Sequence, residues 1–599
     1  MVMGGMLGAS MLLSIHSCTD DHYDIKDGEL GSGNTIWQNI KADSELDSVA
    51  MILSRTKVYT KEEDKKRTMT YAELLDQPQT FTFFAPKDNS KLKVYLDRLD
   101  EADTLRKNNL IDQADKIEYN VGVQFAQNHL ARFNYQGTTG ETEIRLFNGK
   151  LATYIPSVSI NGATITNTIP SSNGIMHVID GLSPFSFNVY DYIGEYADVL
   201  SNVNNIITAQ DTLIFQPNQS IQGSMNSQGQ MVYVDSVFSR QNALLDACGA
   251  QIRNEDSLYV AVIPTDQVWD ADTTKIAKLF NYRNYYKYDY NGGKSPSQAF
   301  PTRFPSKGTY NADSLKTYNV NEALITSMFF TVTNFGGEFK RDQTTEIANY
   351  AMRADSLVST NGKIYYNPNK GGVNPLFGSG HYEVASNGIV FPLIVHNYDP
   401  SNWLMTDNVL DMSYSSNVGN CYAGATPSKG EYTYLTEGSN LNDSIDVSSL
   451  ETKAYRYFAG NRNTALDIFF PLRNVFSGKY RIRAMILPNR VNLNNRWMAN
   501  DTTEVMQNTK FFAKVYDDEG TQIGKNSEDI VVDDNELRIY TLFDEIEIPY
   551  CYYNLPTGVN NSYPLLHLQI PNNNTYQPNR RTYGPALSIV KIYVEPIRE

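Results

Sequence analysis

The sequence predicts a multidomain chain in which two α+β domains are followed by an all-β domain. The first observation is a pair of short motifs that occurs twice in the same order: FTFFAPKDNS at 81–90 with NGIMHVIDGL at 173–182, and LYVAVIPTDQVW at 258–269 with SNGIVFPLIVH at 386–396. The second is the series of short β-branched and aromatic runs after residue 396. The third is the length of 599 residues, which exceeds what one hydrophobic core organises.

The first motif of each pair is typical of a strand that leads into a helix. TFTFF is a β-branched and aromatic run, and it is followed by a proline and by residues that favour helix caps. In the second motif, Asn173 and Gly174 predict a tight turn before a buried strand from Ile175 to Ile179. We expect His177 to be a packed or hydrogen-bonded histidine of this sheet, because no metal-ligand partners stand at a suitable spacing.

The two motif pairs resemble the signature boxes of the fasciclin domain, an adhesion and binding module. The resemblance implies two domains, at 34–188 and, with insertions, at 189–395, each with short helices packed on a wedge of antiparallel strands. Before the first box, residues 35–56 show a helix, a cap and a second helix. Between the boxes, a helical stripe that includes Leu130 is expected. His129 stands where the family has a Tyr-His element. The comparable stretch of the second domain contains no histidine.

Two Asn-Gly pairs in the first domain predict hairpins. One lies in EIRLFNGKLATYI at 143–155 and the other in SVSINGATITNT at 157–168. Each pair is flanked by apolar and polar residues in alternation, the pattern of a half-buried strand on either side of a tight turn. We therefore expect antiparallel strands between the two boxes.

The N-terminal stretch MVMGGMLGASMLLSIHSC resembles a bacterial lipoprotein signal. Cleavage before Cys18 would remove residues 1–17 as a signal peptide, place a lipid on Cys18 and leave 18–33 as a flexible tether. The acidic residues after Cys18 resemble the export signal of Bacteroidetes surface lipoproteins, which implies the outer face of the outer membrane. Because no Lys or Arg precedes the apolar region, we expect translation to start upstream of Met1.

Charge and cysteine content argue against two classes of site. The net charge of −16 disfavours nucleic acid as a partner, because a phosphate backbone requires a basic surface. Once Cys18 carries lipid, Cys248, Cys421 and Cys551 remain, without a C-x-x-C pair. At most one disulfide is possible, between Cys421 and Cys551, and neither a metal site nor a cofactor is expected.

Residues 396–599 predict a jelly-roll-like β-sandwich, because many short strands are separated by Pro, Gly and Asn. The pattern is similar to that of carbohydrate-binding modules and galactose-binding-like domains. Aromatic residues of this region and of a tyrosine-rich insertion at 281–300 are candidates for stacking on a ligand, although packing within the protein is the favoured interpretation for each. The candidates are Tyr285, Tyr286, Trp403, Trp497 and Tyr583.

The leading functional hypothesis is a non-catalytic, surface-exposed outer-membrane lipoprotein that binds a glycan or protein ligand. It would serve as an accessory component of a nutrient-uptake system with a TonB-dependent channel and its lid-like lipoprotein. No nucleophile elbow, zincin motif, P-loop or dinucleotide-binding fingerprint is present, so no enzyme is expected. An adhesin for host matrix or other cells is the alternative that the fasciclin resemblance implies. A glycan hydrolase is a lesser alternative, because a pair among 67 acidic residues would suffice.

Overall fold

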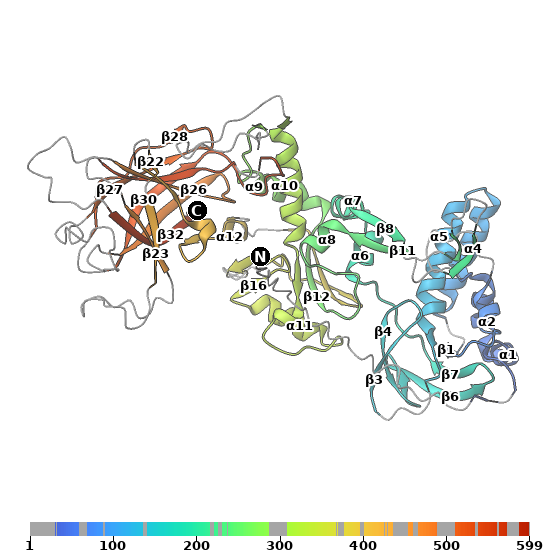
Figure 1. Cartoon of the computed structure of the whole chain (residues 1–599). Coiled ribbons are helices and arrows are strands. Elements are labelled where there is room, and N and C mark those ends of the chain that lie inside the picture. Colours follow the sequence, from blue (N-terminus) through green and yellow to red (C-terminus); the bar gives the residue numbers. More distant parts are fainter. Residues whose placement is uncertain are drawn as a thin grey trace, which may run out of the picture. The chain divides into compact units, whose positions relative to one another are not determined.

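The computed structural model divides into two compact units (Figure 1). The first comprises Met1–Tyr192 with the segments Ile252–Leu258 and Val384–Gly388, and the second comprises Ile193–Gln251, Tyr259–Glu383 and Ile389–Glu599. The structure describes residues 30–31, 33–58, 69–87, 90–135, 140–215, 221–225, 231–235, 238–286, 308–366, 368, 376–395, 401–423, 426–427, 429–434, 453–458, 465–487, 509–532, 537–559, 562–571 and 586–597.

The first unit is built on an open seven-stranded sheet with the order β2-β1-β7-β6-β5-β4-β3. Its strands are β1 (Phe81–Pro86), β2 (Leu130–Arg132), β3 (Thr142–Arg145), β4 (Leu151–Ile155), β5 (Ser159–Ile160), β6 (Ala163–Ser171) and β7 (Gly174–Asp180). The predicted hairpins are confirmed as β3 with β4 and β5 with β6. In the second hairpin, Asn161 and Gly162 both have positive φ, as a two-residue turn of this kind requires.

The two boxes of the first pair form neighbouring strands. β1 and β7 run parallel, with Phe81 opposite Gly174 and Pro86 opposite Ile179. The expectation of a purely antiparallel wedge is therefore wrong at this pair. The physical reason is that β7 takes its direction from its antiparallel hairpin with β6, after the helices and the five strands that separate it from β1 in the chain.

The helices of the first unit precede the first box and follow it. They are α1 (Ile36–Ala42), α2 (Asp47–Arg55), α3 (Tyr71–Leu74), α4 (Lys93–Lys107) and α5 (Ile111–Val121). The predicted helical opening is confirmed, and Thr35 closes a capping box with Gln38. The helical stripe predicted through Leu130 ends earlier, because the chain passes through π and 3₁₀ turns to His129 and Leu130 then begins β2.

Strand β1 separates two apolar cores. Phe83 packs with the buried residues of the helices, and Phe84 packs on the other side with residues of the hairpin strands. His177 belongs to the second core, since its ring stacks on Phe84 with centroids 5.4 Å apart. It also hydrogen-bonds through Nδ1 to the Thr168 hydroxyl at 2.9 Å. The prediction of a packed, hydrogen-bonded sheet histidine is confirmed.

The second motif pair produces the same strand arrangement in a smaller sheet. The order β15-β12-β19-β18 repeats the order β2-β1-β7-β6, with a box on each of the two middle strands. The strands are β12 (Tyr259–Pro264), β15 (Phe329–Thr331), β18 (Glu383–Ala385) and β19 (Gly388–Leu393). As predicted, the first box again leads into a helix, α9 (Asp266–Ala277). The other helices of eight or more residues here are α7 (Ser201–Thr208), α10 (Ala312–Thr326) and α11 (Thr344–Arg353).

Asn173, immediately before the glycine of the second box, holds several segments of the first unit together by hydrogen bonds. The Asn173 side-chain amide donates hydrogen bonds to the carbonyls of Leu75, at 2.8 Å, and Gln77, at 2.7 Å. Its Oδ1 accepts the backbone N–H of Ile36 at 2.8 Å. The asparagine is 1% exposed, so these three bonds join the start of α1 to the turn before β1.

Asn387 has the equivalent position in the second motif pair, and it lies in the segment Val384–Gly388 of the first unit. The Asn387 amide donates to the carbonyls of Ile252, at 2.9 Å, and Asn254, at 3.1 Å. Its Oδ1 accepts the backbone N–H of Val189 at 2.9 Å. The same residue type therefore makes the same three kinds of bond in both copies, which indicates an internal structural repeat.

The C-terminal part of the second unit is all-β in its described residues, as predicted, apart from short helical turns. One antiparallel sheet contains β20 (Asn408–Asp411), β23 (Lys429–Tyr434), β24 (Lys453–Phe458), β26 (Gly478–Leu487), β30 (Arg538–Ile548) and β32 (Ala586–Pro596). The other contains β21 (Asn420–Ala423), β22 (Thr426–Pro427), β25 (Leu466–Pro471), β27 (Lys510–Tyr516), β28 (Gln522–Ile523), β29 (Ile530–Val531) and β31 (Leu565–Ile570). Alternate side chains are buried along β25, β26 and β27, the pattern of sheets with one face on a core.

Cys551 and Cys248 are free, buried thiols. The pairing of Cys421 with Cys551 that the cysteine count left open is therefore wrong. Cys551 instead lies in a packed interior, and burial raises the pKa of its thiol to about 12. A thiol in such a position behaves as a small apolar side chain.

Candidate binding site

Two of the predicted aromatic candidates are packed inside the second unit. Tyr285 is fully buried and donates its hydroxyl to the Cys551 carbonyl at 2.7 Å. Trp403 is 3% exposed and stacks on Tyr365, with centroids 5.2 Å apart. Neither ring has a face open to a ligand, so both are corrected to packing residues. They are apolar bodies whose burial stabilises the fold.

Of the other sequence candidates, the structure describes Tyr286 alone. Tyr286 is half-buried and pairs in a short strand, β13 (Tyr285–Tyr286), with β14 (Thr309–Tyr310). Cys18, Trp497 and Tyr583 lie outside the described residues. The three described candidates, Tyr285, Tyr286 and Trp403, do not line the pocket described next.

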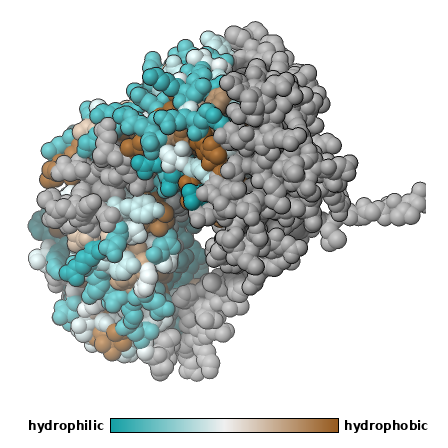
Figure 2. Space-filling model, turned by 90° about the vertical axis from the view of Figure 1, so that its left-hand side faces the viewer, coloured by the Kyte–Doolittle hydropathy of each residue, from teal (hydrophilic) through white to brown (hydrophobic). Residues whose placement is uncertain are grey.

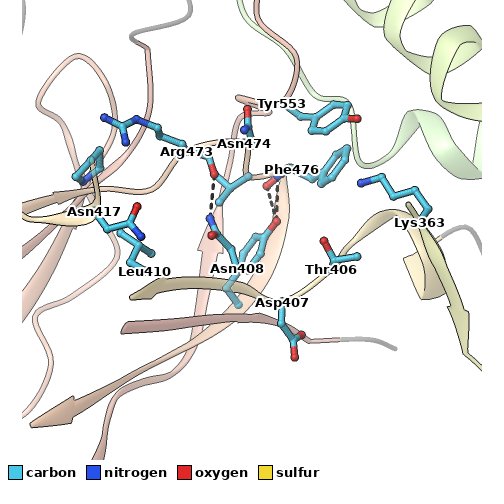
Figure 3. Close-up of a pocket in the computed structure, with 13 residues that line it drawn as sticks. Lys363, Thr406, Asp407, Asn408, Leu410, Asn417, Arg473, Asn474, Phe476 and Tyr553 are labelled. Atoms are coloured by element: carbon cyan, nitrogen blue, oxygen red, sulfur yellow. Dashed lines mark hydrogen bonds between the residues drawn. The ribbon is translucent and has the colours of Figure 1, made fainter. Parts of the chain in front are cut away.

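A different group of residues surrounds a pocket of about 310 Å³ in the second unit (Figure 3). Its size is at the lower end of the range of about 300 to 1,000 Å³ typical of small-molecule sites. Five chain segments supply its wall: the turn between β16 (Ser356–Val358) and β17 (Ile364–Tyr366), the segment from Thr406 to Leu410 at β20, the 3₁₀ turn at 415–417, the stretch from the end of β25 to β26, and the segment after β30. The lining residues are Lys363, Thr406, Asp407, Asn408, Leu410, Asn417, Pro471, Arg473, Asn474, Val475, Phe476, Tyr480 and Tyr553.

Aromatic residues form one wall of this pocket. Tyr553 stacks on Phe476, with ring centroids 4.5 Å apart and an interplanar angle of 21°. Phe280 meets the Phe476 ring edge-on at 5.2 Å. The buried Tyr480 hydroxyl accepts the backbone N–H of Phe476 at 3.0 Å and donates to its carbonyl at 3.1 Å. These contacts fix the aromatic wall, and the Tyr553 ring is only half-buried.

Amide and hydroxyl side chains line the rest of the wall. The Asn408 amide donates to the Arg473 carbonyl at 3.0 Å, which holds the start of β20 against the β25–β26 connection. Thr406 and Asn474 are exposed, whereas Leu410 and Val475 are buried. The pocket therefore combines an apolar floor with polar groups at its mouth, an arrangement that suits a ligand with both hydroxyl groups and a flat apolar face.

Lys363 adds a positive charge to the pocket. In Figure 3 its side chain extends toward Phe476 and Tyr553. The Nζ atom lies 5.3 Å from the centroid of the Tyr553 ring, a cation–π distance. Burial lowers the pKa of this lysine, because desolvation disfavours the charged form.

The described residues contain no group of three or more His, Cys, Asp or Glu side chains able to hold a metal ion. Within the same residues, no helix is both long and apolar enough to cross a membrane. In the described part of the chain, the polar chemistry of the pocket is that of side-chain amides, hydroxyls, aromatic rings, two cationic residues and the carboxylate of Asp407.

Comparison with known proteins gives matches among solved structures. No protein-family model and no curated protein matches the chain. Among solved structures, a domain pair from the insect cell adhesion molecule Fasciclin I is 10% identical, with 61% of this chain and 97% of that chain covered and a TM-score of 0.17. The enzymatically active domain of a bacteriophage tailspike protein is 11% identical, with 31% of this chain and 20% of that chain covered and a TM-score of 0.18. This chain thus spans a fifth of that tailspike domain. Both TM-scores are too low to show a shared fold.

Few features of the sequence indicate the pocket. Lys363 follows Asn361-Gly362, a turn signal, and Tyr553 and Asn554 are next to each other in a tyrosine-rich stretch. These signals are local, and nothing in them predicts that residues almost two hundred positions apart meet at one wall. Only the packing of the second unit brings them together.

Proposed function

We propose that this chain is a non-catalytic, surface-exposed outer-membrane lipoprotein that binds a glycan in the pocket of the second unit. In this proposal, fasciclin-like domains at 34–188 and 189–395 precede a jelly-roll-like sandwich at 396–599. The protein serves as an accessory component beside a TonB-dependent channel and its lid-like lipoprotein. The repeated asparagine geometry of Asn173 and Asn387 supports the fasciclin-like pair.

The observation that carries the glycan proposal is the stacked aromatic pair beside amide and hydroxyl groups. A sugar ring has one apolar face of C–H groups and a rim of hydroxyls, so it requires an aromatic surface and planar hydrogen-bonding side chains at the same place. The half-buried Tyr553, backed by the buried Phe476, supplies the first, and Asn408, Asn474 and Thr406 supply the second. Figure 2 shows one face of the molecule whose coloured residues are mainly hydrophilic, a surface that suits polar partners.

Replacing Tyr553 with alanine is expected to weaken glycan binding by about tenfold. The reason is the loss of ring stacking, worth roughly 1 to 1.5 kcal/mol. Affinity electrophoresis and calorimetry against a panel of soluble polysaccharides would measure this effect. Tyr414→Ala is the matched control, because Tyr414 is 65% exposed and does not line the pocket. If no polysaccharide binds, or if both variants bind like the parent, the glycan proposal is wrong.

Replacing Cys18 with alanine is expected to release the protein from the membrane. In the proposal, the lipid on Cys18 is the sole attachment to the membrane. Without this lipid, no strong contact with the membrane remains. Fractionation of cells that express the parent or the variant would measure the release. Protease added to intact cells would also degrade the parent protein. Full protection from protease would place the protein inside the envelope and contradict the surface location.

A further inference from the structure

We propose that the pocket selects a glycan that carries a carboxylate, such as a hexuronic acid or a sialic acid, with Lys363 binding the acid group. The inference rests on the proposed glycan binding and specifies the chemical class of the sugar. It depends on the position of Lys363, on its surroundings and on the balance of charge around the pocket.

The ammonium of Lys363 points at the aromatic wall where a sugar ring would stack. Its Nζ lies 5.3 Å from the Tyr553 ring centroid. The turn that carries it is rigidly held, since the Lys363 backbone N–H donates to the Ser359 hydroxyl and to the Asn361 side chain, both at 3.2 Å. The charge is therefore placed beside the stacking surface by a fixed turn, within reach of a substituent on a ring bound there.

The described residues supply no carboxylate to Lys363. No salt bridge or side-chain hydrogen bond of its ammonium occurs among them, although the side chain is half-buried. Burial without a counter-ion lowers the pKa of this lysine and costs the folded protein free energy. A carboxylate on the ligand would satisfy the ammonium and make a charge-assisted hydrogen bond in a partly desolvated place.

With Lys363 included, the described lining residues carry one more positive than negative charge. Arg473 lines it and donates to the Ser416 carbonyl at 2.9 Å, without a carboxylate partner among the described residues. The single acidic lining residue, Asp407, is exposed, and its charge acts on Arg483. In a chain with a net charge of −16, a pocket with two cationic residues and one acidic residue is unusual. It favours an anion over a neutral ligand.

The test compares acidic glycans with their own neutral forms. Oligogalacturonate, alginate, heparosan and a sialylated oligosaccharide would each be measured by calorimetry, together with the same glycan after its carboxyl groups are reduced to alcohols. The full chain is expected to bind at least one acidic form about tenfold to a hundredfold more tightly than the reduced form, the effect of one charged hydrogen bond. Lys363→Met should abolish this difference, so that the variant binds the acidic and the reduced form with equal affinity.

The controls separate this inference from the proposed function and from misfolding. Lys340→Met removes the same charge from an exposed site outside the pocket and should keep the full preference. Lys363→Met should unfold at the same temperature as the parent or higher, because it removes an uncompensated buried charge. Equal binding of acidic and reduced forms, weakened by Tyr553→Ala, would overturn the acid preference and leave glycan binding intact. Absence of binding to every form would overturn both.

Discussion

Replacement of Gly174 by alanine is expected to unfold the first domain. Gly174 begins β7 with φ of +130°, and a Cβ atom there would lie 1.9 Å from the Phe81 carbonyl oxygen on the paired strand β1. No side chain tolerates such a contact, and the atom it meets is backbone that cannot rotate away. The two box strands would have to separate, at a cost above about 4 kcal/mol. Hydrogen exchange of the full chain, followed in peptides that cover β1 and β7, would measure the loss.

Gly181→Ala is the matched control for this substitution. Gly181 has φ of +102°, but a Cβ atom there has nothing within 4 Å. Its replacement brings backbone strain alone, about 1 to 3 kcal/mol. The difference in stability between the two variants therefore measures the cost of the steric contact between the parallel strands. Equal protection of β1 in both variants would show that the strands do not approach as closely as described.

The elements that the sequence predicts well are those whose cause is local. The β5–β6 hairpin follows from Asn161 and Gly162, which tolerate positive φ. The first box of each pair forms a strand that ends at a proline, although neither following helix has a side-chain cap hydrogen bond. The parallel direction of β1 and β7 has no such local cause. It depends on the helices and on the five strands β2 to β6 that lie between them in the chain, because β7 takes its direction from its hairpin with β6.

The binding pocket escaped prediction for a related reason. A ring that stacks on a ligand and a ring that packs in a core are the same residue type, so composition does not separate Tyr553 from the buried Tyr285 and Trp403. The distinction comes from the exposed fraction of each ring and its neighbours, and these depend on contacts between distant segments. Lys363 becomes informative only when its surroundings show an ammonium at an aromatic wall.

Acid is expected to destabilise the first domain through two buried histidines. Burial lowers the pKa of both His129 and His177 to about 4 from the ordinary value of 6.5. The unfolded chain therefore binds protons near pH 6.5, whereas the folded chain does not until about pH 4. Stability is full above pH 6.5 and falls as the pH decreases toward 4, by about 3 kcal/mol for each histidine.

The hydrogen bonds of His129 explain why its ring resists protonation. Its Nδ1 donates to the Phe125 carbonyl at 2.8 Å, and its Nε2 accepts the backbone N–H of Ser183 at 3.2 Å. A proton on Nε2 would place two donors against each other, so the neutral ring alone satisfies both neighbours. The buried site therefore stabilises the neutral ring with its proton on Nδ1, in agreement with the lowered pKa of His129.

Urea unfolding of the full chain between pH 7 and pH 4, with exchange of β1 and β7 peptides as the signal, would measure the effect. His129→Gln and His177→Gln should lower stability at pH 7 but flatten its decline in acid, because a neutral amide does not titrate in this range. His381→Gln should leave the decline unchanged, since His381 is 66% exposed and lies in the second unit. If the buried-histidine variants kept the whole acid-dependent loss, carboxylates elsewhere would account for it. If only His129→Gln flattened the decline in stability, the hydroxyl groups around His177, such as that of Thr168, would accommodate a charged ring.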